Sequence, residues 1–208
     1  MDASLDQKIE KLRFLQEEHK RLGVAMVTAG QGVFYPFDYF MTAMLNRSMK
    51  LIDGFVVLIP DNFQCAAPVV RMQLDNFLRT GAARLVSKDV DGFAIDVLNG
   101  VPIKKMQHKT TKAKLTDSFL ADFFDKHYPG LKDVYNKACG YVHLSETHFF
   151  QAISANDESG RISASISRKE QLIPDRLRIE ATHTMCEFTK LLLGFTEEWT
   201  QIKAERVG

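Results

Sequence analysis

The chain lacks the features that mark secreted proteins, membrane-spanning proteins and proteins with structural zinc sites. Its 208 residues include only three cysteines, Cys65, Cys139 and Cys186, which lie far apart and form no Cys-x-x-Cys pair. An odd number at this spacing argues against a disulfide framework or a structural zinc site and favours a reducing compartment. The N-terminal residues carry no signal-peptide pattern, and the longest apolar stretch, residues 51–60, is too short to span a bilayer. We therefore expect a cytoplasmic protein that does not bind membranes.

An excess of charge of one sign is also missing. The 27 Lys and Arg residues nearly balance the 26 Asp and Glu residues, which leaves a net charge of +1. This balance argues against a protein that coats nucleic acid or anionic membrane by its bulk charge. With 45% apolar and 25% charged residues the composition is that of an ordinary globular protein. We expect residues 1–208 to form one domain with a sizeable core.

Apolar residues recur at helical spacing along most of the chain. This periodicity predicts helices at about residues 5–22, 37–58, 64–86, 116–126, 129–153 and 174–206. Residues 89–100 fit either a short strand or a helical turn, and residues 161–167 alternate as a strand does. The sequence therefore predicts an all-α fold, a bundle of six to seven helices with a small β appendage.

Polar residues interrupt the apolar stripe of the helix predicted at residues 129–153. Tyr141, His143 and Ser145 lie on or beside this stripe, and His148 lies on the same flank as Tyr141. His143 and His148 are roughly 140° apart around a helix, so they cannot ligate one metal ion together. These four residues either line a ligand-binding pocket or form a hydrogen-bonded structural cluster between packed helices.

Arg71 and Asp75 occupy the edge of the apolar face of the helix predicted at residues 64–86. Asp75 lies four residues from both Arg71 and Arg79, so local ion pairs are available. If Arg71 points inward it needs a polar partner, because an unpaired buried charge is strongly destabilising. We expect Arg71 to reach the polar residues of the helix at 129–153, in a cluster that is either closed and structural or open to a ligand.

A lysine-rich segment follows the third predicted helix. Residues 104–114 contain His108 and five lysines, namely Lys104, Lys105, Lys109, Lys112 and Lys114. These lysines are candidates for contacts with nucleic-acid phosphates. The segment has no interleaved Tyr or Phe to stack on bases, so a solvated loop is the alternative.

Motifs of metal and cofactor chemistry are absent. The sequence has no His-Glu-x-x-His, no Gly-x-Ser-x-Gly and no P-loop. Glu180 and His183 make half of a di-iron Glu-x-x-His pair, but no second copy exists. Residues 30–32, Gly-Gln-Gly, lack the third glycine of a dinucleotide site. We expect no metal and no cofactor.

Two short segments carry a family resemblance. Residues 69–75, which include Arg71, and residues 141–145, Tyr-Val-His-Leu-Ser, resemble segments of bacterial helical proteins of the HEPN superfamily, including some abortive-infection proteins. The resemblance extends from the second predicted helix to the last. It implies an all-α, often dimeric protein, so that we expect a homodimer or a protein partner in a bacterial defence or stress context.

The resemblance also implies a candidate nuclease centre. Many members of the superfamily are metal-independent ribonucleases with an Arg-x(4–6)-His motif. Matching spacings occur at Arg13 and His19, at Arg176 and His183, and at Arg178 and His183. Arg178 is followed by Ile179, where the family usually has a polar residue, and Arg176 and His183 share a helix face away from the apolar stripe. Our leading hypothesis is a non-catalytic binding module; the rival is a metal-independent endoribonuclease with RNA as partner, and a cofactor-dependent bundle enzyme comes third.

Overall fold

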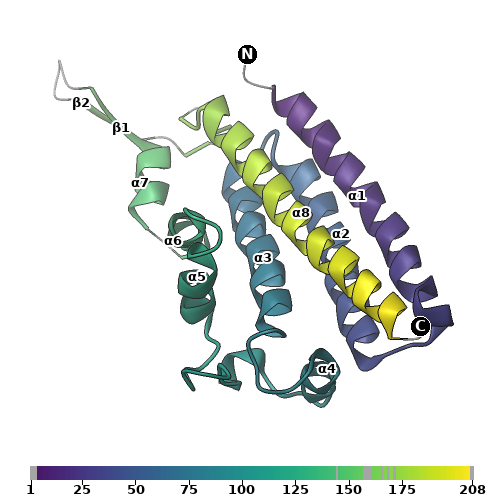
Figure 1. Cartoon of the computed structure of the whole chain (residues 1–208). Coiled ribbons are helices and arrows are strands. Elements are labelled where there is room, and N and C mark those ends of the chain that lie inside the picture. Colours follow the sequence, from purple (N-terminus) through teal and green to yellow (C-terminus); the bar gives the residue numbers. More distant parts are fainter. Residues whose placement is uncertain are drawn as a thin grey trace.

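The computed structural model describes residues 4–143, 145–156, 161–164, 166–167, 169–170 and 172–206. Helices dominate it (Figure 1), and the predicted all-α fold is confirmed. The β appendage is also present, as a two-stranded antiparallel ribbon of β1 (Ile153–Asn156) and β2 (Arg161–Ala164). In its register Ile153 pairs with Ala164.

Four long helices form the core of the fold. They are α1 (Leu5–Thr28), α2 (Pro36–Leu58), α3 (Phe63–Ala82) and α8 (Asp175–Glu205). Helix α1 packs against α2 and α8, and α3 packs against the same two helices, so the four close into a bundle. The apolar faces predicted from the sequence meet inside it, where side chains such as Leu12, Ile52 and Phe77 are fully buried.

Local signals in the sequence account for the starts of these helices. Ser4 and Gln7 form a capping box at the start of α1, and the side chain of Asn62 caps α3. Pro36 is the first residue of α2, where its missing N–H costs nothing. Between α1 and α2, Gly30 and Gly32 both have positive φ, in a short 3-10 turn (Gly30–Gly32) that reverses the chain. The two glycines therefore serve a turn.

Shorter helices surround the bundle. Helix α4 (Val90–Leu98) packs on α2, whereas α5 (Asp117–Asp125) and α6 (Leu131–Val142) cover the outer side of α3. A 3-10 turn (Ile103–Lys105) lies between α4 and α5. Helix α7 (Glu146–Ala152) follows α6 and leads into the β1–β2 ribbon, which extends away from the bundle (Figure 1).

Two local predictions need correction. Residues 89–100 contain a helix, α4, because the Asp89 side chain caps the Gly92 N–H at 2.8 Å and starts a helical turn, so the strand alternative was wrong. The single helix predicted at residues 129–153 is two helices. His143 adopts an extended conformation at the end of α6, and Ser145 then caps α7. Residues beyond Ala152 belong to β1 rather than to a helix.

Candidate functional site

A chain of polar side chains crosses the centre of the bundle and involves all four long helices. His19 Nδ1 lies 2.7 Å from the Leu15 carbonyl, and His19 Nε2 lies 2.8 Å from Ser48 Oγ. Because a carbonyl only accepts, Nδ1 carries the proton and Nε2 accepts from the Ser48 hydroxyl. The Gln73 side-chain amide then donates to Ser48 Oγ at 2.6 Å and to Thr189 Oγ1 at 3.0 Å. Burial lowers the pKa of His19, so the ring is neutral.

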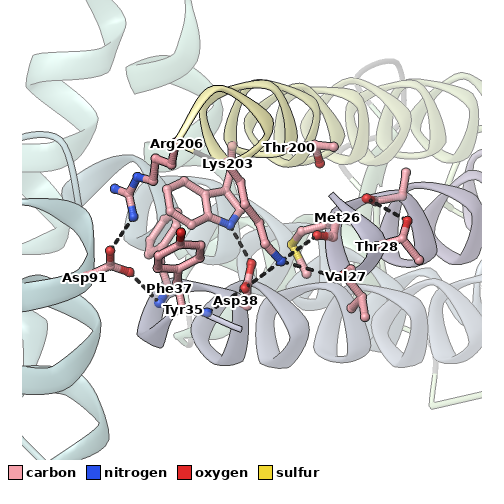
Figure 2. Close-up of polar contacts among 12 residues, drawn as sticks. Met26, Val27, Thr28, Tyr35, Phe37, Asp38, Asp91, Thr200, Lys203 and Arg206 are labelled. Carbon is pink, nitrogen blue, oxygen red and sulfur yellow. Dashed lines mark hydrogen bonds and ion pairs between the residues drawn. The ribbon is translucent and has the colours of Figure 1, made fainter. Parts of the chain in front are cut away.

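A second buried cluster joins the ends of α1, α2 and α8 (Figure 2). The Lys203 ammonium lies 2.9 Å from the Asp38 carboxylate, and both side chains are fully buried. Asp38 also accepts from the Trp199 indole N–H at 2.7 Å and from the Tyr35 backbone N–H at 2.8 Å. Lys203 also donates to the Met26 carbonyl at 2.9 Å, near the end of α1. The hydrogen bonds of both charges are satisfied within the chain, so this cluster is structural.

An arginine covers the outer side of that cluster. Arg206 lies over the rings of Trp199 and Tyr35, at 4.7 and 4.9 Å from their centroids. Its guanidinium bonds to Asp91 at 2.6 Å, and Asp91 in turn accepts from the Phe37 N–H at 3.1 Å (Figure 2). The contacts tie α4 to the end of the bundle.

The predicted contact between Arg71 and the polar residues near Tyr141 does not form. Arg71 donates to Asp117, at the start of α5, at 2.8 Å, and its guanidinium lies 4.6 Å from the centre of the Tyr135 ring on α6. Arg71 therefore does reach α6, but it contacts that helix almost two turns before Tyr141. Asp75 belongs to the same charged row, since it accepts from Arg79 at 3.1 Å. Arg79 also pairs with Asp117.

The other predicted polar residues form the joint between α6 and α7. Ser145 Oγ donates to the Gly140 carbonyl at 2.8 Å, and the Ser145 N–H donates to His148 Nδ1 at 3.3 Å. Tyr141 packs edge-on against Phe63 of α3, with 5.4 Å between ring centroids, and burial raises the pKa of its hydroxyl. His143 is exposed to solvent. This joint supports the structural alternative for Ser145 and His148.

The three nuclease candidates on α8 differ in their surroundings. Arg178 is buried and donates to Glu170 at 2.9 Å and to the Ile173 carbonyl at 2.9 Å. Glu170 also accepts from the backbone N–H of Phe63 at 2.7 Å, so Arg178 fastens the start of α3 to α8. Arg176 is exposed and pairs with Glu180 at 2.8 Å.

His183 is exposed as well. Its Nδ1 lies 3.4 Å from the Lys8 ammonium and 3.8 Å from Glu187. Arg178 is therefore committed to a structural contact, whereas Arg176 and His183 face solvent.

A groove between α6 and α8 consists of two neighbouring hollows of about 420 and 580 Å³, which share Val134 and Thr184 as lining residues. Residues of α3 form the base of the first hollow. Apolar side chains from the three helices cover much of the floor: Phe63, Ala67, Val70, Leu131, Ala138, Leu177, Ala181, Phe188 and Leu191. Polar side chains stand among them: Lys137, Tyr141, Arg176, Glu180, His183 and Glu187.

The groove brings together three of the predicted site residues. Tyr141 and Arg176 line one hollow, and His183 lines the other. Arg71, Asp75 and Arg178 do not line it. Lys137 and Glu180 were not predicted to line a groove, because periodicity shows which face of a helix is polar but not whether a gap separates two helices.

All five lysines of the segment at residues 104–114 are exposed. The segment returns on itself through a bridge between Gln107 and Lys114. Its His108 is buried and accepts from the N–H groups of Thr110 and Thr111, at 3.3 and 3.1 Å. The lysines thus project from a turn with a defined backbone.

Among the described residues, no group of three or more His, Cys, Asp or Glu side chains is placed to hold a metal ion. In the same part of the chain no helix combines the length and apolarity needed to cross a membrane. Comparisons of the chain with protein-family models, with curated proteins and with solved structures give no match. The function must therefore be inferred from the geometry described above.

Proposed function

We propose that this protein is a HEPN-like interaction module without catalytic activity, which binds an amphipathic helix of a partner protein in the groove between α6 and α8. The observation that carries the proposal is the groove itself, an apolar floor from three helices with polar side chains among it. Helix-binding grooves of proteins have this construction. An exposed apolar hollow of this size is typical of a binding site.

The shape and charge of the groove favour a helix as its occupant. Helices α6 and α8 both flank α3, so a further helix laid between them would pack on all three, as helices in bundles do. Near one end of the groove Lys137 is exposed and Arg176 stands close to Glu180. Near the other end Glu187 pairs with Lys190 at 2.6 Å. A partner helix with an acidic residue facing Lys137 would complement the charge of that lysine.

The surroundings of the motif arginines support a role without catalysis. Arg178 is occupied by Glu170 and by a backbone carbonyl, so moving it to a substrate would leave Glu170 with an unpaired, mostly buried charge. Arg176 is paired with Glu180, which would repel a phosphate brought to this point.

Selection of displayed helical peptides tests the groove directly. Peptides that bind the full-length protein are selected and their affinities are measured by fluorescence anisotropy. Ala181→Trp, which fills the groove, should weaken these peptides at least tenfold. Ala204→Trp, a matched change on an exposed position of the same helix, should leave them unaffected. Peptides that bind both variants equally would contradict the proposal.

A ribonuclease assay separates the module from the rival endoribonuclease. Total RNA is incubated with the protein in EDTA, and His183→Ala is compared with His143→Ala, which alters an exposed histidine outside the groove. We expect no cleavage by any of the three proteins. Metal-independent cleavage that is lost only in His183→Ala would overturn the proposal in favour of the nuclease.

Sedimentation of the protein alone examines a second copy as the alternative occupant. A dimer that dissociates in Ala181→Trp but persists in Ala204→Trp would place another copy of the chain in the groove, as the family resemblance to dimeric proteins would suggest. A monomer over the full concentration range leaves the partner helix to a different protein.

A further inference from the structure

The loop between α4 and α5 concentrates positive charge. From residue 97 to residue 116 the chain has five lysines and not one acidic residue, although the whole chain is nearly neutral. The remainder of the chain consequently has more acidic than basic side chains. In Figure 1 this loop lies at the end of the molecule opposite the β1–β2 ribbon. We call residues 103–115 the lysine hairpin.

The backbone of the lysine hairpin is held by hydrogen bonds on both sides. The His108 N–H donates to the Ala113 carbonyl at 2.9 Å, and the Leu115 N–H donates to the Met106 carbonyl at 2.9 Å. The Lys109 N–H donates to the Leu85 carbonyl at 2.7 Å, which fastens the tip to the turn that follows α3. Because its backbone is fixed, the hairpin presents its charges with little loss of backbone entropy on binding.

Buried side chains fix the hairpin from below. The His108 ring packs against both Phe119 and Phe123 of α5, with 5.6 Å between ring centroids in each case. Leu115 is fully buried, and Met106 packs against the core. The apolar side chains thus point inward while the lysines point outward.

Several other surface lysines have a carboxylate partner. Lys20, Lys88 and Lys132 each form an ion pair with a nearby carboxylate. Within the described residues, no carboxylate lies within 4.0 Å of any of the five hairpin ammonium groups. Their charges are therefore available to an external anion.

We propose that the lysine hairpin binds the phosphodiester backbone of a nucleic acid, at a site separate from the α6–α8 groove. Ammonium groups attract phosphates as point charges, and several of them in series match the regular charges of a nucleic-acid strand. The hairpin has no aromatic residue to stack on bases, so it contacts the backbone without reading sequence. An anionic membrane fits less well, because Met106 and Leu115 face the core rather than outward.

The strength of the interaction should depend steeply on salt. Each phosphate neutralised on a single strand contributes about −0.7 to the slope of log affinity against log salt. Five contacts give a slope of about −3.5, which corresponds to roughly a hundredfold loss of affinity between 50 and 200 mM salt.

Anisotropy of a fluorescent 20-nucleotide RNA, and of DNA of the same sequence, tests the proposal with the full-length protein. One variant should lose the salt-dependent binding, because glutamine replaces the five hairpin lysines, namely Lys104, Lys105, Lys109, Lys112 and Lys114. A second replaces the same five by arginine and should retain it. A control variant with the same net charge should bind as the wild type does. In it, glutamine replaces five other exposed lysines, namely Lys11, Lys20, Lys50, Lys126 and Lys132.

Three outcomes would overturn the proposal. The first is an equal loss of affinity in the hairpin and control variants, which would indicate a net-charge effect. The second is an affinity for nucleic acid that does not depend on salt. The third is tighter binding to phosphatidylserine vesicles or to poly-glutamate than to either nucleic acid. Preference for RNA or for DNA identifies the source of the phosphates. Circular dichroism of each variant confirms that it folds. None of these results bears on peptide binding in the groove, so the two proposals stand or fall separately.

Discussion

The buried pair of Asp38 and Lys203 allows a quantitative test of what holds the bundle together. Lys203→Met keeps the length and most of the volume of the side chain but removes its charge. The Asp38 carboxylate would then remain fully buried with only the N–H groups of Trp199 and Tyr35 as donors. Loss of one partner of a buried ion pair typically costs about 3–5 kcal/mol. For a chain of this size the melting temperature should fall by on the order of 10 °C.

The assay is urea unfolding of the wild type, Lys203→Met, Asp38→Asn and the double variant. Because each single change leaves a buried charge alone and the double change leaves none, the double variant should lose less than the sum of the two. The coupling free energy should be at least about 2 kcal/mol. Additive losses, or a loss below about 1 kcal/mol in Lys203→Met, would refute the argument. A change in m-value would show that the denatured ensemble has changed instead.

Three further predictions concern single positions in the core. Burial lowers the pKa of His19 below its value in the unfolded chain, so the unfolded state binds the proton more readily. The free energy of unfolding should therefore fall as pH decreases below about 6.5. Urea unfolding from pH 8 to 5 should show a weaker decline in His19→Gln than in the wild type. Thr80 Oγ1 is buried without a hydrogen-bond partner, so Thr80→Val should leave the melting temperature unchanged or raise it, and a clear fall would indicate a bound water. A Cβ at Gly81 would overlap with the Phe124 ring, so Gly81→Ala should cost about 1–3 kcal/mol. Gly54→Ala, with open space around it, should cost nothing in the same melts.

The long helices could be predicted because burial and helix geometry leave a direct trace in the sequence. Apolar residues on α1, α2, α3 and α8 recur at helical spacing, and these faces are the ones that meet in the core. The break between α6 and α7 could not be predicted in this way. The apolar periodicity continues through the break. The break coincides with one side chain, Ser145, which caps α7 and donates to the Gly140 carbonyl.

Partners of polar residues were harder to predict than their burial. Arg71 is largely buried and paired, as the expected need for a partner implied, but its partners are Asp117 and Tyr135. Periodicity assigns a residue to a face of its own helix and contains no information on how far two helices are shifted along each other. The position of Arg71 relative to Tyr141 therefore could not be obtained from spacing.

The buried polar clusters of the core were not predicted, although the sequence contains a signal for one of them. Lys203 lies four residues after Trp199, on the same face of α8 as Phe195 and Leu192, where a charge needs an explanation. An unpaired lysine at such a position is unfavourable, so an acidic partner on a neighbouring helix was a reasonable inference. Ser48 and Gln73 give a weaker signal, because single polar residues also occur at the margins of apolar faces.

The contacts of Arg71 explain how a gap between two helices can persist next to a closed bundle. Apolar helices tend to pack against one another. Helix α6 would bury more apolar surface by packing on both α3 and α8 than by packing on α3 alone. Arg71 of α3 opposes that closure, because it binds Asp117 at the start of α5 and stacks on Tyr135 of α6. Both contacts hold α5 and α6 against α3. Arg71 therefore restrains the position of α6 without lining the groove.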